Sequence, residues 1–139
     1  MNAERLEGWE DRLLAVVTRA REEAYELGRF DCFRLACLVI EALTGIDRWP
    51  EFDGQYSTKR EALAMLAAHG SNFTEAGNWF FGGEPVSWKL ARRGDILELR
   101  LPDGSAHLVV CLGRTVGGLT DEGFKQFPTR ICAHAWRVG

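Results

Sequence analysis

The sequence predicts an α+β domain in which N-terminal helices precede a C-terminal antiparallel sheet. In the first 70 residues, apolar side chains recur at intervals of three and four, as they do along one face of a helix. From residue 96 onward, short apolar or alternating runs are divided by turn residues, which is typical of strands. The chain has 139 residues and no internal repeat or linker, so we expect a single domain over residues 1–139.

Three helices are expected in the N-terminal half. The first covers residues 3–21, where apolar and charged side chains alternate with helical periodicity. The second begins at Cys32 and ends at Gly45, and it is apolar on nearly every face, so it should be the central helix packed on the sheet. Thr58 and Glu61 have the spacing of a capping box, which starts the third helix.

The rest of the chain should form a loop and then a meandering sheet. Residues 71–90 show no clear period and are expected to be a loop with at most one short helix, in which exposed aromatic side chains would mark a docking surface. The turn residues 102–105 should join the first two long strands in a hairpin. The expected strands cover residues 97–101, 107–113, 115–119, 124–127 and 131–138.

Composition excludes several classes of protein. A net charge of -3 gives no basic field for a nucleic acid backbone. The N-terminus lacks a signal peptide and no apolar run is long enough to span a bilayer, so we expect synthesis in the cytoplasm and no membrane insertion. The four cysteines form no Cys-x-x-Cys pair, which favours reduced thiols over disulfides. A zinc site would need ligands from at least four separate elements, and we expect neither a metal nor a cofactor.

Cys32 and His107 are the candidates for chemistry. A thiol in the first turn of a helix meets unpaired N–H groups and the positive end of the helix dipole, which favour the thiolate. His107 opens an apolar run that is typical of a buried strand, from which it could serve as a base. The alternatives are that Cys32 is a small buried core residue and that His107 bonds a loop carbonyl. His69 is expected to contact the carbonyls at a helix end, and His134 to face solvent on the last strand.

Several motifs together resemble those of the NlpC-type cysteine peptidases. They are Tyr25, Gly28 and Asp31-Cys32 at a helix start, Gly94-Asp95-Ile96 at one strand start and Ala106-His107-Leu108 at the next. Members of this family have a reduced papain-like fold and cleave peptide bonds in the stem peptides of bacterial cell walls. Other segments resemble a branch encoded among phage and prophage tail genes: Thr44-Gly45-Ile46-Asp47, Gly54-Gln55-Tyr56 and Ala135-Trp136-Arg137-Val138. That resemblance implies a place in the virion tail tip beside hub and fibre proteins, with a peptidoglycan stem peptide as substrate.

The resemblance also implies roles for individual residues. Cys32 matches the family nucleophile and His107 its general base. Asp31 matches the acidic residue before the nucleophile, and Tyr25 matches the upstream aromatic residue that supports the oxyanion site. The third polar residue of the family falls on the strand after the histidine, where Thr120 is the nearest candidate.

The sequence departs from the family pattern beside the nucleophile. Phe33 and Arg34 follow Cys32 where active members usually have a small serine and glycine, so a narrower substrate cleft is expected. Two functions stay open: a cell-wall cysteine peptidase that helps genome entry, and a catalytically idle structural part of the tail tip. A cytosolic amidase that acts on a small metabolite is a third possibility.

Overall fold

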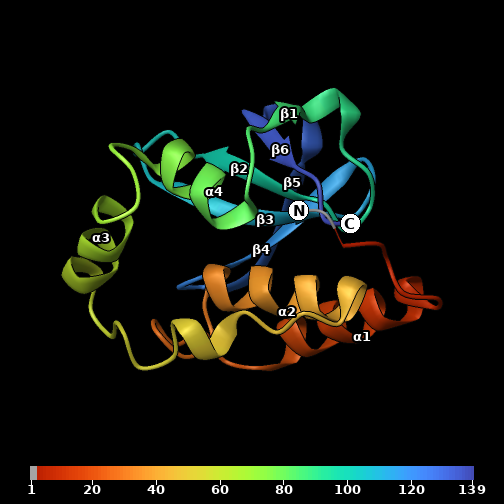
Figure 1. Ribbon diagram of the computed structural model, residues 1–139, viewed down its shortest axis with the longest axis horizontal. Coiled ribbons are helices and arrows are strands. Elements are labelled where there is room, and N and C mark those ends of the chain that lie inside the picture. The colour runs from red at the N-terminus through yellow and green to blue at the C-terminus, as the bar shows by residue number, and fades with distance from the viewer. Residues whose placement is uncertain (1–2) are drawn as a thin grey trace.

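The structure, a computed structural model, describes residues 3–139 and confirms the predicted α+β class. The helices are α1 (Trp9–Glu22), α2 (Cys32–Thr44), α3 (Lys59–Ala67) and α4 (Phe73–Phe81). The strands are β1 (Val86–Ser87), β2 (Ile96–Arg100), β3 (Ala106–Cys111), β4 (Thr115–Thr120), β5 (Gly123–Pro128) and β6 (His134–Trp136). Figure 1 shows α1 and α2 side by side below the sheet, with α3 standing apart at one edge.

The sheet is antiparallel with strand order β1-β6-β2-β3-β4-β5. Strands β2 to β5 form the predicted meander, but β6 returns to the far side of β2 and separates it from β1. Strand β3 pairs with β4 only through Val110 and Cys111. The two strands therefore diverge toward the start of β3, where His107 pairs with Leu99 of β2 but has no partner from β4 in the described chain.

Two apolar layers cover the two faces of the sheet. The larger lies between the sheet and α1 and α2, and it contains eight of the nine buried residues of α2. The smaller lies on the opposite face and contains Leu97, Val109 and Cys132 among others. Because β3 has an apolar layer on each face of the sheet and α2 is enclosed within the larger layer, both segments are almost wholly apolar in sequence.

The first helix begins later than its amphipathic pattern predicts. It starts at Trp9, after Gly8 with a φ of 77°. The preceding residues are held by contacts with the C-terminal part of the chain instead: Arg5 Nε donates to the Val138 carbonyl at 2.8 Å and Arg5 Nη2 contacts Asp95 Oδ1 at 3.0 Å. These contacts bring the two ends of the chain together, as Figure 1 shows.

Residues 71–90 contain one short α-helix, α4, as the prediction allowed, but the aromatic residues assigned to a loop lie in that helix. The Asn72 side chain accepts a hydrogen bond from the Glu75 N–H at 2.8 Å, which caps the start of the helix. The aromatic residues expected to be exposed are mostly covered: Phe80 and Phe81 are buried. Trp79 is half exposed and stacks on His69, with 3.6 Å between the ring centroids, so His69 has an aromatic partner rather than only helix carbonyls.

The His134 side chain is partly exposed, but it contacts a buried carboxylate and does not only face solvent as predicted. Its Nε2 lies 2.9 Å from Oε1 of Glu98, which is fully buried although it alternates with leucines in β2. Thr74 of α4 donates to the same oxygen at 2.7 Å, and Arg100 donates to the other oxygen at 2.8 Å. The carboxylate is therefore bonded on both oxygens and links α4, β2 and β6.

Within residues 3–139 no helix combines the length and the apolar character needed to cross a membrane.

Candidate functional site

The residues before α2 form a tight loop around the carboxylate of Asp31. This buried side chain accepts hydrogen bonds from the N–H of Gly28 and the N–H of Arg34, both at 2.9 Å, and from the hydroxyl of Tyr56 at 2.5 Å. The bond from Arg34 caps α2. Gly28 has a φ of 85°, and a Cβ at this position would lie 2.1 Å from the Tyr56 carbonyl oxygen, so only glycine fits the loop.

Cys32 is the first residue of α2 and is partly exposed, whereas the other three cysteines are buried. Burial of the sulfur atom and the neighbouring Asp31 carboxylate raise the thiol pKa to about 11, while the backbone N–H groups of Leu108, Cys32 and Phe33 act in the opposite direction. The expected stabilisation of the thiolate by the helix start is thus outweighed in the free protein. At neutral pH the sulfur carries its proton.

His107 lies half buried near the start of β3. Its Nε2 is 2.9 Å from the Ser105 hydroxyl oxygen. Burial lowers the pKa of the imidazole, against the opposing effect of Asp103 and Asp121, so the ring is predominantly neutral near pH 7. Among the described residues, no hydrogen bond joins the His107 ring to Cys32.

Cys32 and His107 line the same cavity, which has a volume of about 1050 Å³. The apolar wall of this cavity comes from α2, α3 and α4 and includes Phe33, whose ring packs edge-on against Phe52 with centroids 4.8 Å apart. The polar side is formed by the β2–β3 turn and the β4–β5 turn. His107, which has no β4 partner in the described chain, belongs to this side, and Cys32 at the start of α2 lines the same cavity.

The other two residues of the candidate site also line the cavity, but their contacts differ from expectation. Tyr25 is partly exposed, and burial with the charges of Asp31 and Cys32 raises the pKa of its phenol. The Thr120 hydroxyl donates to the Gly123 carbonyl at 2.9 Å and accepts from the Glu122 N–H at 3.2 Å. Thr120 is therefore engaged in its own turn and, within residues 3–139, makes no hydrogen bond with His107.

Three residues around the site were not anticipated. Tyr56 is bonded to Asp31 across 25 positions of sequence, and no local pattern predicts such a pair. From the sequence, Ser105 and Asp103 are given only a role in the turn. The position of Ser105 two residues before His107 is a usable signal, because residues two apart in an extended chain share a face. Within the described chain, no group of three or more His, Cys, Asp or Glu side chains has metal-binding geometry.

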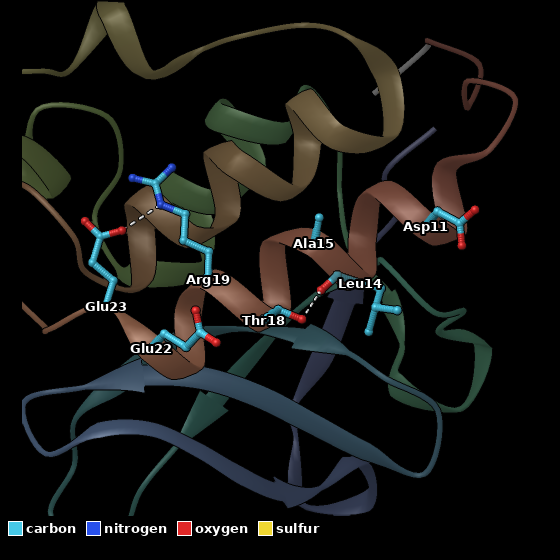
Figure 2. A pocket seen from close by; sticks show the side chains of 7 residues that line it. All are labelled: Asp11, Leu14, Ala15, Thr18, Arg19, Glu22 and Glu23. Carbon is cyan, nitrogen blue, oxygen red and sulfur yellow. Dashed lines mark hydrogen bonds and ion pairs between the residues drawn. The ribbon is translucent and has the colours of Figure 1, made fainter.

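A second depression, of about 630 Å³, follows the outer face of α1 (Figure 2). Three of its polar side chains already have partners: Thr18 donates to the Leu14 carbonyl at 2.9 Å, and Arg19 pairs with Glu23 at 2.7 Å. The residues that line it, Asp11, Leu14, Ala15, Thr18, Arg19, Glu22 and Glu23, include neither a histidine nor a cysteine. The cysteine and histidine pair proposed from the sequence therefore belongs to the larger cavity and not to this depression.

The fold and the cavity define an α+β protein with a cysteine and a histidine on the two sides of one cleft. A family model described as a domain of unknown function, DUF6950, matches residues 4–138, so the chain belongs to this family. No curated protein matches the sequence.

Proposed function

We propose that the protein is an NlpC-like cysteine hydrolase that cleaves amide bonds, with Cys32 as nucleophile and His107 as general base. One observation carries this proposal: the start of α2 and the start of β3 bring both side chains to one cavity. The backbone N–H of Leu108, next to His107, is close enough to the Cys32 sulfur to lower the pKa of its thiol. The resemblance to the NlpC-type peptidases, and to their phage tail branch, suggests a peptidoglycan stem peptide as substrate.

The proposed reaction has two steps. His107 takes the proton of the Cys32 thiol, the sulfur attacks the substrate carbonyl carbon, and the C–N bond breaks as His107 returns the proton to the leaving amine. Water then attacks the resulting thioester, which releases the carboxylic acid and restores the thiol. The backbone N–H of Cys32 and the hydroxyl of Tyr25 would bind the negative oxygen, and each such donor lowers the barrier by about 3 kcal/mol.

The protonation states fit this order of events. A thiol with a pKa of about 11 holds its proton at neutral pH, and His107, with its lowered pKa, is in the form that accepts one. Proton transfer therefore accompanies attack on the substrate instead of preceding it as a stable ion pair. The catalytic hydrogen bond must form when substrate binds, as is common where the free enzyme has long catalytic contacts.

A structural role in a phage tail tip, beside hub and fibre proteins, is the second candidate function. The missing hydrogen bond between Cys32 and His107 in the described chain favours an inactive cleft, and the resemblance to the phage tail branch suggests the tail tip as its place. Under this function the protein is made in the host cytoplasm, enters the virion and leaves the cleft unused.

Digestion of purified cell walls tests the hydrolase. The protein should release stem-peptide fragments, and Cys32→Ala and His107→Ala should each abolish the release while circular dichroism shows an intact fold. His69→Ala is a matched control, because His69 lines the same cavity and stacks on Trp79 but has no proposed catalytic role.

The alternative outcomes separate the candidate functions. If the intact protein releases no fragments from walls or from soluble dipeptides, the hydrolase is rejected and the tail-tip component remains. Activity on soluble dipeptides with none on walls would instead indicate an amidase for small metabolites.

A further inference from the structure

We propose that Ser105, supported by Asp103, is the positioning residue for His107 and fixes its neutral ring as the Nε2–H tautomer, leaving Nδ1 as the basic nitrogen. This inference rests on the proposed role of His107 as general base. It assigns the third polar position of the site to the turn before β3 instead of to Thr120 on the strand after it.

The hydrogen bonds determine the tautomer. The Ser105 hydroxyl donates its single proton to Asp103 Oδ1 at 2.5 Å, and its oxygen lies 2.9 Å from His107 Nε2. Because that proton is already used, the serine oxygen can only accept from the ring, so Nε2 must carry the hydrogen. The other ring nitrogen then keeps its lone pair free for the thiol proton.

Asp103 is suited to support this chain of hydrogen bonds. Bonds from the Ser105 hydroxyl and the Ser105 N–H lower the pKa of the Asp103 carboxyl, so it is ionised at neutral pH. An ionised carboxylate only accepts hydrogen bonds, which holds the serine proton on the Asp103 side. Its negative charge also stabilises His107 once the imidazole is protonated.

The backbone holds Ser105 and His107 in fixed relation. Leu101 donates its N–H to the Ser105 carbonyl at 2.9 Å, which closes the turn, and His107 is paired with Leu99 of β2. Residues 105 and 107 are two apart in extended chain, so their side chains leave the same face. The serine oxygen is therefore held against the ring without a contribution from any distant segment.

The charges that face His107 come from three elements. Asp103 lies in the β2–β3 turn, Asp121 in the β4–β5 turn, and Lys59 at the start of α3. Only Asp103 is connected to the ring through a hydrogen-bonded side chain. Removing Ser105 should therefore change both the tautomer and the pKa, whereas neutralising Asp103 should change mainly the pKa.

Nitrogen-15 NMR of the histidine rings tests this difference. The intact protein should show the Nε2–H form of neutral His107. Ser105→Ala should give a mixture of tautomers and lower the His107 pKa by about 0.5 to 1 unit, because the imidazolium loses its acceptor. Asp103→Asn should lower the pKa as well but keep the tautomer, since the amide oxygen can accept the same bonds from Ser105.

A second pair of variants keeps the test independent of folding effects in the turn. Ser105→Thr and Ser105→Val have nearly the same shape, but only threonine has the hydroxyl. The threonine variant should retain the Nε2–H form and the valine variant should lose it. If His107 has the same tautomer and pKa in both, the positioning role is wrong.

Activity measurements separate this proposal from the hydrolase itself. In an active enzyme, Ser105→Val should lower kcat about tenfold or more with little change in KM, whereas Ser105→Thr should restore it. If the enzyme is active but its kcat and the nitrogen-15 spectrum of His107 do not change when Ser105 is replaced, only the positioning role is overturned. An inactive protein whose His107 tautomer depends on Ser105 would reject the hydrolase but retain the hydrogen-bonded arrangement.

Discussion

Replacing Tyr56 by phenylalanine removes one hydroxyl and should destabilise the loop that presents Cys32. The hydroxyl donates to the buried Asp31 carboxylate at 2.5 Å, and bonds to charged groups contribute about 1.5 to 3 kcal/mol. The same carboxylate oxygen keeps its bond from the Gly28 N–H, so it is not left unpaired. We therefore expect a loss near the lower end, about 1.5 to 2 kcal/mol.

Urea unfolding, followed by far-ultraviolet circular dichroism, measures this loss. The midpoint should fall by about 1 M with an unchanged slope, because the folded state keeps its buried surface. Tyr25→Phe is the matched control: within the described residues the Tyr25 hydroxyl makes no hydrogen bond, and its removal should change stability by less than about 0.5 kcal/mol. If Tyr56→Phe is as stable as Tyr25→Phe, the Tyr56 hydroxyl does not stabilise the loop through Asp31.

Three further predictions concern pH, backbone and a buried charge. The folded state raises the pKa of Cys32 from 9.0 to about 11, so it binds the thiol proton more tightly than the unfolded chain does. The resulting contribution to the free energy of unfolding is full below pH 9 and is lost as pH rises through about 11, by up to about 1.4 kcal/mol per pH unit. Urea unfolding measured across this pH range should show a smaller fall in stability with pH for Cys32→Ala. Gly28→Ala should cost more than about 2 kcal/mol because its Cβ meets the Tyr56 carbonyl, whereas Gly8→Ala, also at positive φ but with nothing within 4 Å, should cost only about 1 kcal/mol, and equal losses would contradict the steric argument. Glu98→Ala should cost about 3 kcal/mol in thermal or urea unfolding, because the three side chains bonded to this carboxylate lose their partner; a loss under 1 kcal/mol would mean that the network is not stabilising.

The limits of α2 and the hairpin were predictable because their signals are local. Asp31 caps α2 from the adjacent position, and Gly45, with a φ of 80°, ends it. The turn at residues 102–105 joins β2 and β3 as its composition indicates. By contrast, the sequence prediction allows one short helix in residues 71–90 but places the aromatic residues in a loop, although Asn72 and Glu75 have the spacing of a helix cap.

Some residues of the candidate site were likewise predictable from the sequence, and others were not. The sequence singled out Cys32 and His107 as the reactive pair, and the structure brings both to one cavity. It also indicated Thr120 as the third residue, but the Thr120 hydroxyl bonds its own turn, whereas Ser105 contacts the His107 ring. A hydroxyl has the same appearance in a sequence whichever partner it has, so only the folded turn distinguishes the two.

Three features follow from local sequence alone: helices precede strands, the central helix starts at its cysteine, and a hairpin carries the histidine. Hydrophobic periodicity and capping act over a few neighbouring residues, which is why these features could be read without coordinates. Three other features arise only when the whole chain folds: the burial of Glu98, the bond from Tyr56 to Asp31 and the raised pKa of Cys32. Each depends on solvent exclusion and charges supplied by segments far apart in the chain, and no local pattern encodes them.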